Sequence, residues 1–310
     1  MKVHQNIYTL PPFRNAVVTI GTFDGVHTGH RKIIQQLKRE AEATDGEAVI
    51  ITFHPHPRMV VKSSTPLQLI NSFSEKLELL EETGIHHLVV VPFTEEFAQQ
   101  SAQDYVGNFL VARFQPHTII IGYDHRFGKN RQGDYRLLEE LGASFNYTVK
   151  EIPEQVLNEI TVSSTRIRQA LTSGDLQTAN DYLGYPFFFE GRVVLGNQLG
   201  RTLGYPTANL EIEDPDKLVP ANGVYAVQVS LTGSSDGREY KGMMNIGTRP
   251  TIDGKNRVIE VNIFDFSGDI YGETLRVYLK KRLRAEEKFN GLEALKEQLA
   301  KDRIDALDAL

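Results

Sequence analysis

The sequence contains no cysteine among its 310 residues. This absence excludes disulfide scaffolds, cysteine nucleophiles and zinc sites built on thiolates, and it fits a reducing compartment. The sequence also lacks any run approaching about 18 apolar residues, so no membrane-spanning helix is expected. Segment 1–12 has no apolar signal-peptide core. We therefore expect a cytoplasmic protein with no membrane partner.

An excess of positive charge is absent as well. The chain carries 34 Lys and Arg against 40 Asp and Glu, a formal net charge of −6, and neither half is basic. Bulk charge therefore argues against a nucleic-acid partner, and any phosphate ligand must be held by local groups. Hydrophobic residues make up 40% and charged residues 24%, as in ordinary globular proteins. A length of 310 residues exceeds the usual size of one hydrophobic core, so two domains are expected.

An alternation of strand and helix patterns fills the first half of the chain. Apolar and β-branched runs predict strands at 17–20, 49–53, 88–91 and 118–121. Amphipathic patterns predict helices from residue 29 onward, at 74–83 and at 101–114. Apolar strands that alternate with helices indicate a parallel sheet covered on both faces, with ligands at the carboxyl ends of its strands. The predicted fold class of this half is an α/β parallel-sheet domain.

The pattern changes around Gly184. Strand signals at 187–195, 223–231, 240–245, 258–264 and 274–280 are separated by turn residues. This spacing predicts a small antiparallel β-barrel, followed by a C-terminal helix over residues 291–307. The predicted domains are therefore residues 1–184 and residues 185–310.

The first motif with chemical content is Gly-Thr-Phe-Asp-Gly-Val-His-Thr-Gly-His at residues 21–30. It lies between a predicted strand and a predicted helix, where glycines let the backbone approach a ligand and free N–H groups face an anion. His27 and His30 are three residues apart and can face one phosphate together, where they would stabilise the charge that builds up during nucleotidyl transfer. A zinc site without an obvious third ligand is one alternative. A glycine-rich turn with two surface histidines is another.

This motif resembles the signature of the HxGH nucleotidyltransferases, most closely that of their flavin-specific branch. The resemblance implies a Rossmann-like nucleotidyltransferase domain in which His27 and His30 are catalytic. It also implies that other residues of the motif bind the nucleotide, namely Gly21, Phe23, Asp24 and Gly29.

A second stretch, Ser-Ser-Thr-Arg-Ile-Arg at 163–168, resembles the same family. Ser163 or Ser164 is a natural N-cap of a helix. Two arginines then lie in the first turn, where positive charge opposes the helix dipole unless an anion such as an ATP phosphate lies there. A capped helix with solvated arginines is the alternative. The resemblance implies nucleotide-binding roles for Ser164, Thr165, Arg166 and Arg168.

Two loops after predicted strands resemble the flavin side of the same site. Thr-Phe-His-Pro-His-Pro, after the second strand, resembles a Pro-His-Pro loop and implies that His56 and Pro57 lie beside the flavin; a rigid turn is the alternative. Gly-Tyr-Asp-His-Arg-Phe-Gly, after the fourth strand, resembles a segment near both substrates through Asp124 and Arg126. The common family form has Phe where this chain has His125, so the aromatic contact there differs.

The strongest motif of the second half is Gly-Arg-Thr-Leu-Gly-Tyr-Pro-Thr-Ala-Asn-Leu at 200–210, which resembles the riboflavin kinase core. Thr207 offers a hydroxyl oxygen and Asn209 a carbonyl oxygen, both suited to a Mg²⁺ ion that bridges ATP phosphates. A pair of β-turns is the alternative. The resemblance implies that other residues of this loop border ATP and flavin, namely Gly200, Arg201, Gly204 and Pro206.

Glu260 lies in the predicted strand 258–264, where alternation puts it on one face with Asn262 and Phe264. A kinase that phosphorylates an alcohol needs a carboxylate to orient the hydroxyl or to accept its proton. The resemblance implies that Glu260 is this base and that Asn245 and Arg249 border the site. A surface glutamate is the alternative.

The two motif sets stand in the order found in bifunctional prokaryotic FAD synthetases, and this resemblance covers residues 13–290. It implies that the barrel, with Mg²⁺, phosphorylates riboflavin to FMN. The first domain would then transfer adenylate from ATP to FMN, giving FAD and pyrophosphate. The implied ligands are riboflavin, FMN, FAD and ATP, with no nucleic acid and no obligate protein partner.

Three alternatives stay open on the sequence alone. A nucleotidyltransferase that activates pantetheine phosphate or glycerol phosphate explains residues 21–30 but neither residues 206–209 nor Glu260. A kinase whose first half has decayed is suggested only by His125. A non-catalytic flavin-binding or regulatory protein would need neither His30 nor Glu260.

Overall fold

The computed structural model describes residues 1–61, 66–122, 125–152, 162–196, 199–233, 237–251 and 254–310. The side chains of residues 199, 249–251 and 254–256 lie outside this description. The chain forms two compact units. One comprises residues 1–67 and 73–163, and the other residues 68–72 and 164–310.

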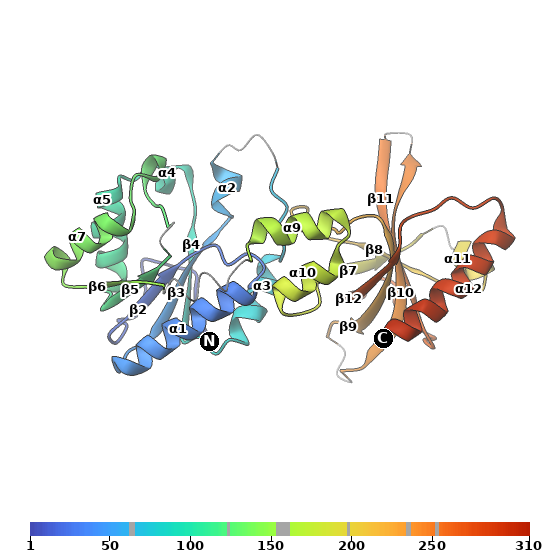
Figure 1. The fold of residues 1–310 in the computed structure, drawn as a ribbon, viewed down its shortest axis with the longest axis horizontal. Helices are drawn as coiled ribbons and strands as arrows, with labels where there is room; N and C mark the ends of the chain where they lie inside the picture. The colour runs from blue at the N-terminus through green and yellow to red at the C-terminus, as the bar shows by residue number, and fades with distance from the viewer. Residues whose placement is uncertain (62–65, 123–124, 153–161, 197–198, 234–236, 252–253) are drawn as a thin grey trace. The chain divides into compact units, whose positions relative to one another are not determined.

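The first unit is built on a six-stranded parallel sheet in the order β1-β4-β3-β2-β5-β6 (Figure 1). Its strands are β1 (Lys2–His4), β2 (Val17–Ile20), β3 (Ala48–His54), β4 (His87–Pro92), β5 (Thr118–Ile121) and β6 (Thr148–Glu151). The central strands β2, β3 and β5 are buried almost throughout, which is why their sequences are continuous apolar runs.

Helices cover both faces of this sheet. Ile34, Leu37 and Ala41 are buried on the helix that begins at Thr28. Val18 and Ile51 of the sheet belong to a buried cluster that also contains residues of the helical stretch ending at Phe114. The helical elements are α1 (Thr28–Ala43), α2 (Pro57–Val60), α3 (Phe73–Glu81), α4 (Glu95–Ala98), α5 (Ala102–Asp104), the π-helical η1 (Tyr105–Val111), α6 (Ala112–Phe114), the 3₁₀ turn η2 (Lys129–Arg131) and α7 (Tyr135–Phe145).

The strand order places a topological switch point at β2. The chain runs from β2 outward to β3 and β4 and then returns to the other side of β2 to form β5. Ligands of open parallel sheets bind at such a switch point, outside the carboxyl ends of the strands. The residues that follow β2 are 21–27, which belong to the first predicted motif.

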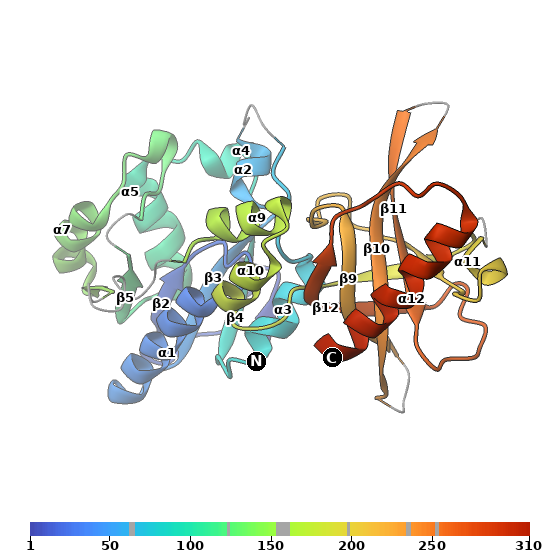
Figure 2. The same ribbon diagram turned by 45° about the vertical axis from the view of Figure 1, so that its right-hand side comes forward.

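The second unit contains a closed antiparallel barrel in the order β10-β11-β8-β7-β12-β9. Its elements are α9 (Ser164–Ser173), α10 (Leu176–Leu183), β7 (Phe188–Val194), α11 (Leu199–Thr202), β8 (Ala208–Glu211), β9 (Gly223–Leu231), β10 (Glu239–Thr251), β11 (Gly254–Ile263), β12 (Thr274–Arg284) and α12 (Leu292–Ala309). Figure 2 shows α12 lying across β9, β10 and β12.

The predicted fold class is confirmed: a parallel-sheet α/β unit is followed by a small antiparallel barrel and a C-terminal helix. Among the residues that the structure describes, no helix is both long enough and apolar enough to cross a membrane.

An ion pair at the end of β12 anchors α12 to the barrel. Arg284 donates from Nε to Asp302 Oδ1 at 2.8 Å and from Nη2 to Oδ2 at 2.6 Å. Asp302 is 1% exposed, and its carboxylate contributes to raising the pKa of Arg284. Two parallel bonds to a buried carboxylate make this contact much stronger than an exposed pair.

We expect Asp302→Ala to destabilise the second unit by roughly 3 kcal/mol, because removing one partner leaves a largely buried guanidinium unpaired. The free energy of unfolding from denaturant titration of the full chain measures this loss. Asp265→Ala is the matched control, since Asp265 pairs with Arg303 at 3.2 Å and is 87% exposed. A similar loss in both variants would contradict the anchoring role of Asp302.

Candidate functional site

The loop after β2 has an unusual backbone that ends in a histidine cap. Phe23, Gly25 and Val26 have φ angles of 49°, 91° and 33°. A β-branched residue rarely adopts positive φ, and such strain is often kept at functional sites. His27 is the N-cap of α1, and its Nδ1 accepts a hydrogen bond from the His30 backbone N–H at 3.2 Å. The loop therefore delivers His27 directly to the start of a helix, where anions bind.

The structure brings His27 and His30 together, as predicted. Their ring centroids are 3.6 Å apart with planes 15° from parallel. Burial lowers the pKa of His27 to about 4, against an opposing effect of the Asp24 carboxylate. Burial, followed by the neighbouring charges of His27 and Lys76, lowers the pKa of His30 well below its ordinary value. Both rings are therefore uncharged at neutral pH, and a neutral imidazole keeps one N–H that can donate a hydrogen bond.

The other predicted residues of this motif lie around the histidine pair. Phe23 is 3% exposed, and its ring centroid is 5.0 Å from that of His30. Asp24 is 4% exposed, and Gly29 is buried in the first turn of α1. Gly21 donates its N–H to Ile51 O at 3.0 Å, which joins the loop to β3. The spacing of the motif thus corresponds to one compact site.

Sequence reasoning missed two buried polar residues beside this loop, Lys76 and Thr52. Lys76 Nζ lies 3.4 Å from Thr22 O and 3.5 Å from Thr52 Oγ1. Thr52 donates from Oγ1 to the same Thr22 carbonyl at 3.2 Å. The sequence did carry a signal that Lys76 is buried, because its spacing puts it on one face of α3 with the apolar Leu79 and Leu80.

Three of the four predicted flavin-side residues are described by the structure, which shows their local contacts. His56 is the N-cap of α2, with Nδ1 accepting from Arg58 N at 3.1 Å, and Pro57 is the first helical residue. Arg126 is exposed, and its Nη1 donates to His125 O at 3.1 Å. Asp124 lies outside the described residues. Their contacts with a flavin stay predictions.

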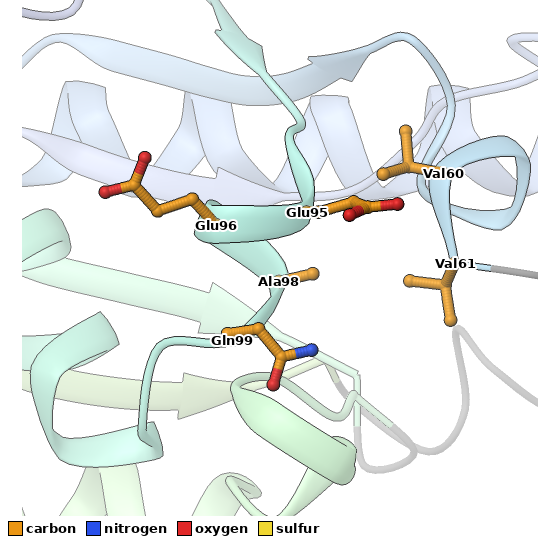
Figure 3. A pocket seen from close by; sticks show the side chains of 6 residues that line it. All are labelled: Val60, Val61, Glu95, Glu96, Ala98 and Gln99. Carbon is orange, nitrogen blue, oxygen red and sulfur yellow. The ribbon is translucent and has the colours of Figure 1, made fainter.

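A hollow of about 400 Å³ lies between the end of α2 and α4. In Figure 3, Glu95 and Ala98 point toward Val60 and Val61, whereas Glu96 points away. Its lining is completed by Gln99. None of these six residues belongs to the predicted motifs, so the hollow by itself assigns no chemistry.

The second predicted nucleotide-binding stretch, residues 163–168, leads into a helix of the second unit. Helix α9 starts at Ser164 and includes Thr165, and Arg166 is exposed. Arg168 Nε donates to the backbone carbonyl of Gln68 at 2.7 Å. The contact of this helix start with a nucleotide stays a prediction.

In the barrel, three predicted residues form one row across neighbouring strands. Asn245 of β10 is directly opposite Glu260 of β11, which is directly opposite Asn209 of β8. Directly opposite residues project to the same face of an antiparallel sheet. Ile259 and Val261 occupy the other face and are buried. The row therefore joins the predicted base to one predicted metal ligand.

The loop that carries the predicted metal ligands, residues 200–209 (the metal loop), packs closely on two glycines. A Cβ atom on Gly200 would lie 2.3 Å from Tyr205 O and 3.4 Å from Thr207 Oγ1. A Cβ atom on Gly196 would lie 2.1 Å from Asn209 Nδ2. The backbone of these glycines thus sets the positions of Thr207 and Asn209.

We expect Gly200→Ala to lower the rate of the barrel's reaction on the order of 100-fold, because the added methyl group displaces Tyr205 and with it Thr207. FMN formation from riboflavin, the activity that the resemblance implies for the barrel, measures this effect. The implied adenylyl transfer to added FMN is the internal control. An unchanged rate of FMN formation would contradict the packing argument.

The remaining predicted loop residues are less constrained. Gly204 has a φ of 85°, which favours glycine, and no atom of the described residues lies within 4 Å of its Cβ position. Arg201 and Pro206 are exposed. Arg249 pairs with Asn256 through the backbone of β10 and β11, and its side chain lies outside the described residues.

Asn262 is a further polar residue near Glu260. The sequence predicts only that it lies on the same strand face as Glu260. It is 5% exposed, and its Nδ2 donates to Pro206 O at 2.6 Å. Its Oδ1 is buried without a hydrogen-bond partner among the described residues. Asn262 therefore ties the metal loop to the strand that carries Glu260.

The donor atoms near Glu260 fit Mg²⁺. Thr207 and Asn209 supply a hydroxyl and an amide oxygen, which are hard ligands without thiolate or imidazole. Among the described residues, no group of three His, Asp or Glu side chains converges as a metal site. The residues therefore suit an ion that takes most of its ligands from phosphates and water.

Two family models match the chain, one described as FAD synthetase over residues 11–166 and one described as riboflavin kinase over residues 183–310. Curated relatives from Escherichia coli K12 and Bacillus subtilis 168 are both described as bifunctional riboflavin kinase/FMN adenylyltransferase. The first is 36% identical over 99% of this chain and 97% of the relative. The second is 37% identical over 94% of this chain and 92% of the relative.

A solved structure from Streptococcus pneumoniae, described as a macrolide-efflux protein, superposes with a TM-score of 0.85. It is 32% identical and covers 98% of this chain and 97% of that chain.

Proposed function

Because the chain belongs to the family of bifunctional riboflavin kinase/FMN adenylyltransferases, we propose that it makes FAD from riboflavin in two ATP-dependent steps. We assign adenylyl transfer to residues 1–184 and the kinase to residues 185–310. The observation that carries the proposal is the presence in one chain of two built sites. One is the stacked His27–His30 pair at the switch point, and the other is the row of Asn245, Glu260 and Asn209 on the barrel.

In the kinase step, Glu260 orients the 5′-hydroxyl of riboflavin and accepts its proton. The hydroxyl oxygen attacks the γ-phosphorus of ATP, and ADP leaves. Thr207 and Asn209 would hold Mg²⁺, which when bound neutralises charge on the ATP phosphates. The register of β8, β10 and β11 supports this assignment, because it lines up the base with Asn209.

In the adenylyl transfer step, a phosphate oxygen of FMN attacks the α-phosphorus of a second ATP, and pyrophosphate leaves. The attacking phosphate is already ionised, so no general base is needed. His27 and His30 donate hydrogen bonds to the charge that develops on the α-phosphate. The lowered pKa of both rings supports a role as neutral donors rather than as cations.

The remaining predicted residues complete the first site in this proposal. Gly21, Phe23, Asp24 and Gly29 form the nucleotide loop, and we also assign Ser164, Thr165, Arg166 and Arg168 to nucleotide binding. His56, Pro57, Asp124 and Arg126 lie on the flavin side. The substrates are small molecules, and we expect the reaction in the cytoplasm without an obligate protein partner.

The efflux activity named for the Streptococcus pneumoniae structure is not carried over to this chain. Both family models and the curated relatives name flavin enzymes instead. A nucleotidyltransferase for another phosphate substrate leaves the Glu260 row without a role, and a decayed first site leaves the buried histidine pair without one.

One incubation of the purified chain with riboflavin, ATP and Mg²⁺ tests the proposal. Chromatography of the flavins should show FMN first and FAD later. FMN alone would contradict the adenylyl transfer assignment, and no product would contradict both.

A further inference from the structure

Lys76 is a buried lysine that neither proposed step uses. It is 9% exposed and lies on α3, facing the carboxyl ends of β2 and β3. Its Nζ is close to the Thr22 carbonyl at the start of the nucleotide loop and to the Thr52 hydroxyl at the end of β3. Removing an ammonium from water is costly, so a lysine at this position needs a compensating role.

The surroundings of Lys76 offer only partial compensation. Burial lowers the pKa of Lys76 to about 8, and the Asp24 carboxylate acts in the opposite direction. The Phe73 ring centroid is 5.6 Å from Nζ. On the side of α1, the charge of Lys76 contributes to lowering the pKa of His30. Glu75, the preceding residue of α3, is buried as well.

On the basis of the proposed adenylyl transfer, we propose that Lys76 is a positioning residue for that reaction. Its ammonium holds the Thr22 carbonyl and faces Asp24, which keeps the loop in the conformation that aligns His27 and His30. Its charge also offsets the negative charge that the triphosphate of ATP brings to the switch point. Methionine, which is of similar length, supplies neither effect, whereas a deprotonated lysine still donates to the Thr22 carbonyl but supplies no charge.

The test compares Lys76→Met with the wild type in FAD formation from added FMN. We expect kcat/KM for ATP to fall on the order of 100-fold at neutral pH, as for a displacement of catalytic groups. Since kcat/KM reports the free enzyme, the ratio of wild type to variant should decline toward one as pH rises through about 8. Deprotonated lysine is neutral, as methionine is. Burial keeps the pKa of His27 and of His30 below this range, so both rings stay uncharged near pH 8 and do not produce the decline.

Two controls separate positioning from structural support. Lys38→Met removes a lysine of the same unit that also donates to a backbone carbonyl, Thr83 O at 2.9 Å, and should retain FAD formation. FMN formation by the Lys76→Met chain should equal that of the wild type. If Lys76→Met does not fold, Lys76→Arg takes its place. Its charge does not titrate, so the loss of kcat/KM that deprotonation of Lys76 causes in the wild type above about pH 8 should be absent from this variant.

A ratio that stays constant with pH, or full activity of Lys76→Met, overturns the inference while leaving the proposed function in place. A loss of kcat/KM above about pH 8 that is as large in Lys76→Arg as in the wild type also overturns it. If the wild type forms no FAD from FMN, the proposed function and this inference both fail.

Discussion

The His30→Ala variant is expected to lose FAD formation while still converting riboflavin to FMN. Removing one preorganised donor to a developing oxyanion typically lowers kcat by roughly 10²–10³-fold. The barrel site shares no residue with the loop, so FMN should accumulate. Chromatography of flavins formed from riboflavin, ATP and Mg²⁺ measures both activities in one sample.

His86→Ala is the matched control for this variant. His86 lies in the same unit, where its Nδ1 accepts from Ala48 N at 2.9 Å, outside the nucleotide loop. This variant should retain both activities. Equal loss of FMN and FAD formation in a folded His30→Ala chain would contradict two separate sites.

Glu260→Gln should have the opposite phenotype. Glutamine keeps the size of the side chain and its place between Asn245 and Asn209 but cannot accept the proton. Loss of a general base costs roughly 10²–10⁴-fold, so FMN formation should nearly stop. Added FMN should still be adenylylated at the wild-type rate, measured by FAD appearance.

Glu239→Gln serves as the control, because Glu239 is an exposed glutamate of β10, one of the strands in the same barrel. It should leave both steps unchanged. Retained kinase activity in Glu260→Gln would refute its assignment as the base.

The parts of the fold that local pattern determines were predictable. The strand Val17–Ile20 was expected at its observed bounds, because a buried parallel strand is a continuous apolar run. The histidine pair was predictable from a spacing of three residues on a helix start. In the barrel, strand alternation correctly placed Glu260 and Asn262 together on β11.

Features that depend on partners distant in sequence were not predictable. Strand β8, with the sequence Ala-Asn-Leu-Glu, has little intrinsic strand preference and exists because it pairs with β7 and β11. Helix α7 and strands β1 and β6 were also missed. The spacing of Lys76 from Leu79 and Leu80 indicates that it lies on the buried face of α3, but its contact with Thr22 depends on the fold. The Pro206–Asn262 hydrogen bond joins residues 56 positions apart.

The most direct test of the central claim is to mix the two variants that each lack one of the two activities. His30→Ala alone should convert riboflavin only to FMN, and Glu260→Gln alone should convert riboflavin to nothing. Together, with riboflavin, ATP and Mg²⁺, they should form FAD, because FMN made by the barrel of one chain is adenylylated by the other. If each folded variant retains its own half-reaction and the mixture still forms no FAD, the account of two independent sites is contradicted.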